Sequence, residues 1–112
     1  MPGLAAPTPI ADTLFLAAFE QARAAGYRLG DGAEHQFRYA ADQAAAQIEA
    51  AGSEEAAGAM LEHARRSFAT MIATMIEGAE TIEGYRAAQP GTIGEVTFTH
   101  AMGKLCPLWP FC

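Results

Sequence analysis

The sequence predicts an all-α fold, a small helical bundle of three to four helices with a long third helix. Apolar residues recur at steps of three and four through most of the chain, which is the spacing of one face of an amphipathic helix. Residues that begin and end helices stand between these stretches. A chain of 112 residues suits one hydrophobic core, so we expect a single helical domain over residues 1–112.

The first helix is expected to begin at Pro9 and to end before Gly26. Residues 1–8 are rich in Pro, Gly and Ala and lack periodicity, so we expect a flexible leader there. Thr8 can cap the helix with its hydroxyl, and Pro9 suits the first helical position because an N–H has no helical partner there. Gly26 can adopt the left-handed backbone that ends a helix.

The second helix is expected to follow a glycine-rich loop between Tyr27 and Gly32 and to run to about Ala51. Asp31 is followed three residues later by Glu34, which is the spacing of a capping box. Gly52 then follows the last apolar position of this stretch and is expected to end the helix.

The third helix carries the strongest pattern in the sequence. Ser53 followed by Glu54 and Glu55 predicts its start, because acidic side chains are favourable at the positive end of the helix dipole. The pattern extends as far as Gln89, where Pro90 must break the helix. Its apolar face is formed by Ala57, Met60, Leu61, Ala64, Phe68, Met71, Ile72, Met75, Ala79 and Ile82.

Residues 93–102 fit either a helix or a strand. Thr92 and Glu95 repeat the capping-box spacing and Gly103 can end a short fourth helix, whereas the alternation of apolar residues with threonines is typical of a strand. We favour the helix. Residues 105–112 contain two prolines, so we expect an irregular apolar C-terminal tail.

Composition argues against two classes of function. The formal net charge of −6 is unfavourable for direct nucleic-acid binding, because phosphate contacts require clustered Lys and Arg. No apolar run approaches the roughly 18 to 20 residues of a membrane span. The N-terminus lacks the positive charge of a secretory signal, so we expect a cytoplasmic protein. A disulfide between Cys106 and Cys112 is disfavoured in that compartment, although their spacing permits one under oxidation.

The first helix is apolar on more than one side. Either it contacts two other helices of the bundle, or its second side meets another chain, and the sequence favours neither reading. The apolar residues concerned are Ile10, Leu14, Phe15, Leu16 and Phe19.

Two further faces have a core reading and a binding reading. Met60, Met71 and Met75 form a flexible stripe on the third helix that either fills the core, which we favour, or adapts to a partner. The second helix has a face of mostly small residues, for which we favour internal packing over a homodimer seam. Its members are Ala33, Phe37, Ala40, Ala41, Ala44, Ile48 and Ala51.

The tail holds the only Trp of the chain. Eight uncharged residues left in water would promote aggregation, so we expect the tail to dock. We favour packing on its own bundle over insertion into a groove of a partner, where Trp109 and Phe111 would be the anchors.

The sequence contains no recognised catalytic motif, and we expect no cofactor. It lacks a Gly-x-Ser-x-Gly nucleophile, a phosphate-binding Gly loop and a His-Glu-x-x-His metal site. Cys106 and Cys112 could form a Cys2His2 zinc site with two of the three histidines His35, His63 and His100, but their spacing is not that of a zinc module. We therefore predict no catalytic, cofactor-binding or metal-binding residue.

The chain is short, acidic and helical throughout, with a double-sided first helix and a long methionine-bearing helix over 53–89. In these respects it resembles the small bacterial antiactivators of quorum sensing. The resemblance implies binding to a LuxR-type transcription factor, which would prevent its dimerisation and DNA binding. Because no family motif is matched, the resemblance assigns no binding residue.

We interpret the chain as a regulatory protein, rather than an enzyme, that binds another protein and forms a homodimer. The alternatives are a small metal-binding protein or enzyme of unknown chemistry, and a structural subunit of a larger assembly. The candidate partner contacts are Leu14, Phe15, Phe19, Met71, Met75, Trp109 and Phe111.

Overall fold

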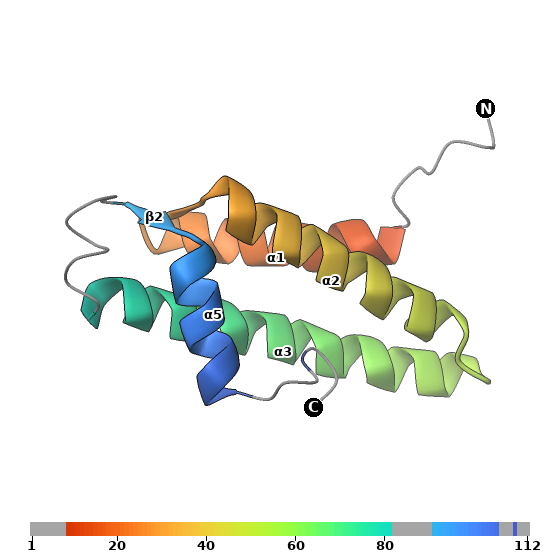
Figure 1. Ribbon diagram of the computed structural model, residues 1–112. Coiled ribbons are helices and arrows are strands. Elements are labelled where there is room, and N and C mark those ends of the chain that lie inside the picture. The colour runs from red at the N-terminus through yellow and green to blue at the C-terminus, as the bar shows by residue number, and fades with distance from the viewer. Residues whose placement is uncertain (1–8, 82–90, 106–108, 110–112) are drawn as a thin grey trace.

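Three long helices bury their apolar faces against one another, and a shorter helix crosses the third of them (Figure 1). In this computed structural model the described residues are 9–81, 91–105 and 109. The all-α prediction with a long third helix is confirmed. The elements are α1 (Pro9–Ala24), β1 (Arg28–Leu29), α2 (Asp31–Glu49), α3 (Glu54–Thr81), β2 (Thr92–Ile93) and α5 (Glu95–Lys104).

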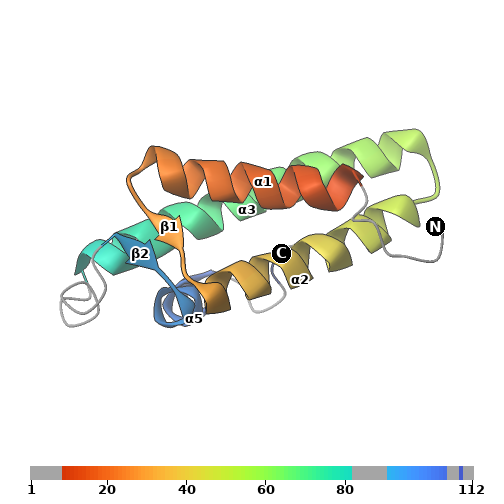
Figure 2. The same ribbon diagram turned by 90° about the horizontal axis from the view of Figure 1, so that it is seen from above.

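The arrangement of the helices shows why the first helix is apolar on more than one side. α1 packs against both α2 and α3, while α5 packs mainly on α3 and also touches α2 (Figure 2). α1 and α5 therefore cover different parts of the α2–α3 pair. The two-helix reading of α1 is confirmed, although one of its apolar residues, Leu16, stays exposed.

The core combines bulky side chains from α1, α2 and α3 with a small-residue face on α2. The face predicted for close internal packing is buried, apart from the partly exposed Ala51, which lies beyond the end of α2. The small side chains of this face allow neighbouring helices to approach closely. The largest fully buried side chains are Leu14, Phe37, Phe68, Met71, Ile72, Met75, Ile93 and Thr97.

Several predicted helix ends are confirmed. α1 begins at Pro9, and Gly26 follows it with a left-handed φ of 88°. Ser53 caps α3, because its Oγ accepts a hydrogen bond from the backbone N–H of Ala56 at 3.1 Å. The predicted Thr8 cap and the continuation of α3 to Gln89 lie outside the described residues.

The second helix differs from the prediction at both ends. Its N-cap is Gly30, which has no side chain to accept a hydrogen bond, so the predicted capping box of Asp31 and Glu34 is wrong. The helix ends at Glu49, two residues earlier than expected. The N–H of Ala50 donates to the Ala46 carbonyl and the N–H of Ala51 donates to the Ile48 carbonyl, each at 3.1 Å.

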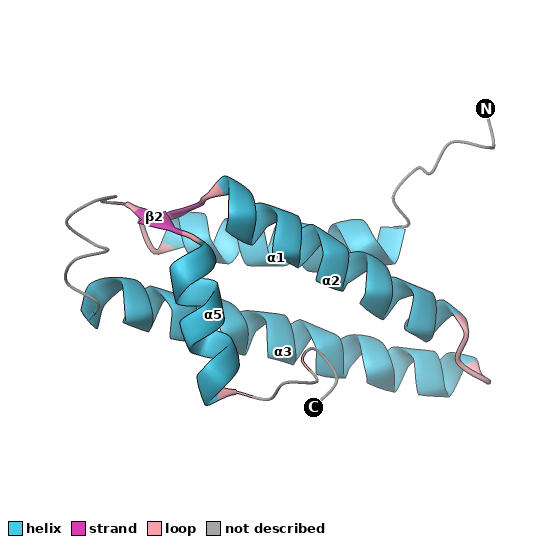
Figure 3. Ribbon diagram, viewed as in Figure 1, coloured by secondary structure: helices cyan, strands magenta, loops and turns pink. Residues whose placement is uncertain are grey.

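A two-stranded parallel sheet joins the start of α2 to the start of α5. The sequence predicted a loop at the first strand and the start of a helix at the second. Figure 3 shows how small this sheet is beside the helices. Arg28 pairs with Thr92 and Leu29 pairs with Ile93. The N–H of Arg28 donates to the Gly91 carbonyl and the N–H of Gly30 to the Ile93 carbonyl, each at 2.9 Å.

The helical reading of residues 93–102 is confirmed, with shifted ends. α5 starts after Gly94 and runs through Gly103 to Lys104. The predicted capping box of Thr92 and Glu95 is displaced, because Thr97 provides the capping side chain instead. Its Oγ1 accepts from the Gly94 N–H at 3.1 Å and donates to the Gly94 carbonyl at 2.8 Å.

Candidate protein-binding surfaces

Four aromatic rings from four parts of the chain form one cluster among α2, α3 and α5. Phe37 comes from α2, Phe68 from α3, Phe98 from α5 and Trp109 from the tail. The centroid of the Trp109 ring lies 4.8 Å from that of Phe68, 5.4 Å from that of Phe37 and 5.9 Å from that of Phe98. Aromatic pairs at these separations are stabilising, mostly edge to face here.

The indole of Trp109 also makes a directional contact. Its Nε1 donates to the backbone carbonyl of Ser67 on α3 at 3.1 Å. Trp109 is partly buried, so the tail packs on its own bundle at this residue, as the favoured reading predicted. The second predicted anchor, Phe111, lies outside the described residues.

Four of the other predicted partner contacts are core residues. Leu14, Met71 and Met75 are 0% exposed and Phe15 is 3% exposed. A side chain without accessible surface cannot touch another molecule in this conformation, so we no longer assign these four residues to a binding face. They fill the core, which was the favoured reading for the methionine stripe and one of the two open readings for the first helix. Met60 alone of the methionine stripe is partly exposed.

Phe19 is the remaining predicted contact, and it lies at the edge of the outward face of α1. It is partly exposed and stacks on Phe15, with ring centroids 6.1 Å apart. Arg38 of α2 lies over the Phe15 ring, with its guanidinium carbon 3.9 Å from the ring centroid. The same guanidinium lies 3.7 Å from a carboxylate oxygen of Asp12.

Leu16 is the large apolar residue of α1 that is exposed to solvent, with 51% of its surface accessible. It belongs to the double-sided pattern but was not among the predicted contacts. The sequence signal for its exposure is the polarity of its helical neighbours, because Asp12, Thr13 and Glu20 are three or four residues away and share its side of the helix.

Two other large apolar residues are exposed in the described part of the chain, Tyr39 at 61% and Val96 at 52%. Single exposed apolar residues are ordinary on protein surfaces. The residues three and four positions from Tyr39 on α2 are all polar, and those that follow Val96 on α5 are Thr99 and His100. Leu16 differs because partly exposed Phe19 lies one helical turn away.

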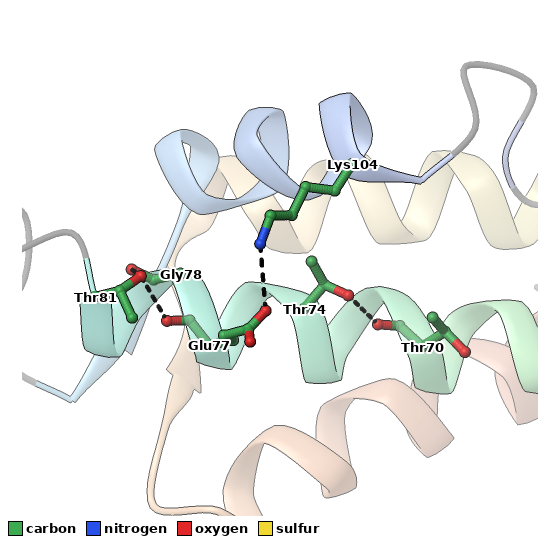
Figure 4. Close-up of polar contacts among 6 residues, drawn as sticks. All are labelled: Thr70, Thr74, Glu77, Gly78, Thr81 and Lys104. Atoms are coloured by element: carbon green, nitrogen blue, oxygen red, sulfur yellow. Dashed lines mark hydrogen bonds and ion pairs between the residues drawn. The ribbon is translucent and has the colours of Figure 1, made fainter.

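The outer side of α3 near α5 is polar and largely satisfied within the chain (Figure 4). Thr74 Oγ1 donates to the Thr70 carbonyl at 2.9 Å, and Thr81 Oγ1 donates to the Glu77 carbonyl at 3.0 Å. Lys104 of α5 lies 3.5 Å from a carboxylate oxygen of Glu77. Exposed ion pairs of this kind contribute little to stability. Among the described residues of α3, no large apolar side chain is exposed.

The described residues contain no group of three or more His, Cys, Asp or Glu side chains placed to hold a metal ion. Cys106 and Cys112 lie outside these residues. Within the same part of the chain, no helix is long and apolar enough to cross a membrane.

Comparison of the chain with protein-family models, with curated proteins and with solved structures gives no match.

Proposed function

We propose that this protein is a small helical regulator that acts by binding another protein through the outward face of α1. The observation that carries the proposal is the exposure of Leu16 next to partly exposed Phe19. The buried centre of a protein interface is more apolar than the rest of the surface and is enriched in aromatic residues such as Phe.

The polar surroundings of this pair also support a binding role. Asp12 and Glu20 flank Leu16, and Arg23 lies one turn beyond Phe19. Polar residues around an apolar centre form the rim of an interface and keep the unbound protein in solution.

The finer proposal is that the partner is a LuxR-type transcription factor and that the protein is an antiactivator that blocks its dimerisation and DNA binding. The resemblance in size, charge and helical layout supports this proposal. A competitor for a dimerisation surface requires apolar anchors and no catalytic chemistry. The net charge of −6 fits an inhibitor that binds the transcription factor rather than the DNA.

The experiment is a comparison of two matched variants in a tagged pull-down from the native cells. Leu16→Glu and Val96→Glu each place a carboxylate on a helix at a site about half exposed, so both are expected to fold. Stoichiometric recovery of a protein by the wild type and by Val96→Glu, but not by Leu16→Glu, supports the proposal. Equal recovery by both variants, or no recovery by the wild type, contradicts it.

The antiactivator proposal has its own test once a transcription factor is recovered. The purified protein should release that factor from its promoter DNA in a mobility-shift titration, and Leu16→Glu should not. A complex that still binds DNA would contradict antiactivation while leaving protein binding in place.

A further inference from the structure

Four side chains form a straight stripe on the outward face of α1. Asp12, Leu16, Phe19 and Arg23 follow one another at steps of four, three and four residues, which keeps them on one side of an α-helix. Leu16 and Arg23 are exposed, and Asp12 and Phe19 are partly exposed. Along the helix axis the stripe therefore carries an acidic side chain, two apolar side chains and a basic side chain, in that order.

This stripe is complementary to itself when it is reversed. Leu16 and Phe19 each lie 1.5 residues from their midpoint, and Asp12 and Arg23 each lie 5.5 residues from it. At 1.5 Å per residue these offsets are about 2 Å and about 8 Å along the helix axis. An antiparallel copy of α1 centred on the same midpoint would place Leu16 beside Phe19 twice and Asp12 beside Arg23 twice.

We propose that the partner of this face is a second copy of the chain, in a two-fold symmetric dimer with the two α1 helices antiparallel. A two-fold interface uses the same surface on both copies, so it requires this kind of self-complementarity. The proposal rests on the proposed function in one respect, namely that the outward face of α1 binds protein. It adds the identity of one partner and the register of the contact.

The charges on α1 favour this arrangement over the other orientations and registers of two α1 helices. A parallel pair in the same register would place Asp12 against Asp12 and Arg23 against Arg23. An antiparallel pair centred on Leu16 would place Asp12 against Glu20. Like charges opposite one another are destabilising, so only the antiparallel register centred between Leu16 and Phe19 matches both charged ends.

Both charged residues can accept the new contact. Arg23 has no ion-pair partner among the residues that the structure describes. Asp12 has only a long contact to Arg38, at 3.7 Å, and both side chains are 46% exposed. The Asp12 carboxylate therefore keeps room for a second guanidinium from the other copy.

The dimer is expected to be weak, because one helix provides the contact. α1 has 16 residues and is about 24 Å long at 1.5 Å per residue. A seam of this length is smaller than the roughly 800 Å² per partner of a standard interface, so the Kd is expected between about 1 μM and about 1 mM. A foreign partner that uses the same face would compete with this self-association.

The test is sedimentation equilibrium of the purified full chain from ~1 μM to ~1 mM, a range that spans the expected Kd. Leu16→Glu should raise the dimer Kd at least ~10-fold, because two unpaired carboxylates would enter the seam. Val96→Glu, an equally exposed site on α5, should leave it unchanged. A monomer throughout this range, or a dimer that Leu16→Glu leaves intact, would overturn the proposal.

A charge exchange tests the register. Arg23→Asp should weaken the dimer, because Asp12 would then face an aspartate of the other copy. Arg66→Asp, at an exposed position of α3, makes the same change in net charge and should leave the dimer Kd unchanged. The double variant Asp12→Arg with Arg23→Asp should restore the wild-type Kd to within a few-fold, and failure to restore it would refute the register.

These measurements use no foreign protein, so they separate the dimer from the proposed function. A monomeric chain whose pull-down is still lost in Leu16→Glu would refute the dimer alone. A dimer broken by Leu16→Glu, with a pull-down that the variant leaves unchanged, would refute the proposed α1 face for foreign partners alone. Circular dichroism of every variant should show the wild-type helical signal.

Discussion

The side chain of Trp109 donates its indole N–H to the carbonyl of Ser67, 42 residues earlier in the chain, at 3.1 Å. The same ring packs on Phe68 and lies edge to face with Phe37 and Phe98. One residue of the tail therefore joins three helices, because each of these rings belongs to a different one. We expect these contacts of Trp109 to stabilise the position of α5 on the bundle, because a helix of ten residues is marginal in isolation.

Replacement of this tryptophan should destabilise the protein. Trp109→Ala removes the ring from the cluster and is expected to lower the free energy of unfolding by about 2 to 4 kcal/mol, below the upper end of such changes because the ring is only partly buried. Trp109→Phe keeps an aromatic ring but loses the hydrogen bond and should cost less. Urea denaturation measures both, and a loss under ~0.5 kcal/mol for Trp109→Ala would show that the cluster does not hold the fold together.

The buried hydroxyl of Thr97 provides a second prediction. Thr97 is completely buried and bonds both the N–H and the carbonyl of Gly94 at the start of α5. Thr97→Val keeps the shape but leaves the Gly94 N–H without this acceptor, at a cost of about 1 to 3 kcal/mol. Thr97→Ser keeps the hydroxyl and should cost less than Thr97→Val in the same denaturation assay. If valine were as stable as serine at this position, the hydrogen bond would not be needed.

Gly26 and Gly52 provide a matched pair for a backbone prediction. An added Cβ meets nothing within 4 Å at either position, but Gly26 has a φ of +88° and Gly52 has no left-handed φ. Gly26→Ala should therefore cost about 1 kcal/mol, whereas Gly52→Ala should be neutral or stabilise by up to about 1 kcal/mol through the unfolded chain. Thermal melts of the two variants should shift in different directions or by clearly different amounts. Equal shifts would contradict a role for left-handed backbone at the end of α1.

The helices were predictable because their signals are local. Pro9, Gly26 and Ser53 mark boundaries through the backbone conformations and hydrogen bonds they allow, and the structure has these boundaries. The predicted capping boxes that start at Asp31 and Thr92 were wrong, and the reason is the same for both. In both places a glycine next to the helix takes the N-cap position, and a two-residue strand fixes the chain just before it.

The contacts between distant parts of the chain were not predictable from local patterns. The pairing of Arg28 with Thr92 and the contact of Trp109 with Ser67 each join segments that are far apart in the sequence. The sequence predicted that the tail docks on the bundle but not the place where it docks. Neither periodicity nor spacing carries that information.

The candidate site was only partly predictable for a geometric reason. The apolar pattern of α1 identifies residues that avoid water, but it does not show how many neighbours surround the helix. Leu14 and Phe15 turned out to be core residues, and the adjacent Leu16 faces solvent. A difference of one or two residues rotates a side chain by 100° or 200° around the helix, so the binding face could be located only after α2 and α3 had been placed.

The most direct test of the protein-binding role is photo-crosslinking in the native cells, with a benzophenone amino acid introduced at one position at a time. The probe should replace Leu16 on α1 or, as the control of equal exposure, Val96 on α5. The account predicts a discrete protein adduct from position 16, either with a second copy of the chain or with another protein, and none from position 96. Adducts from position 96 alone, or the same adducts from both positions, would contradict the assignment of α1 as the binding face.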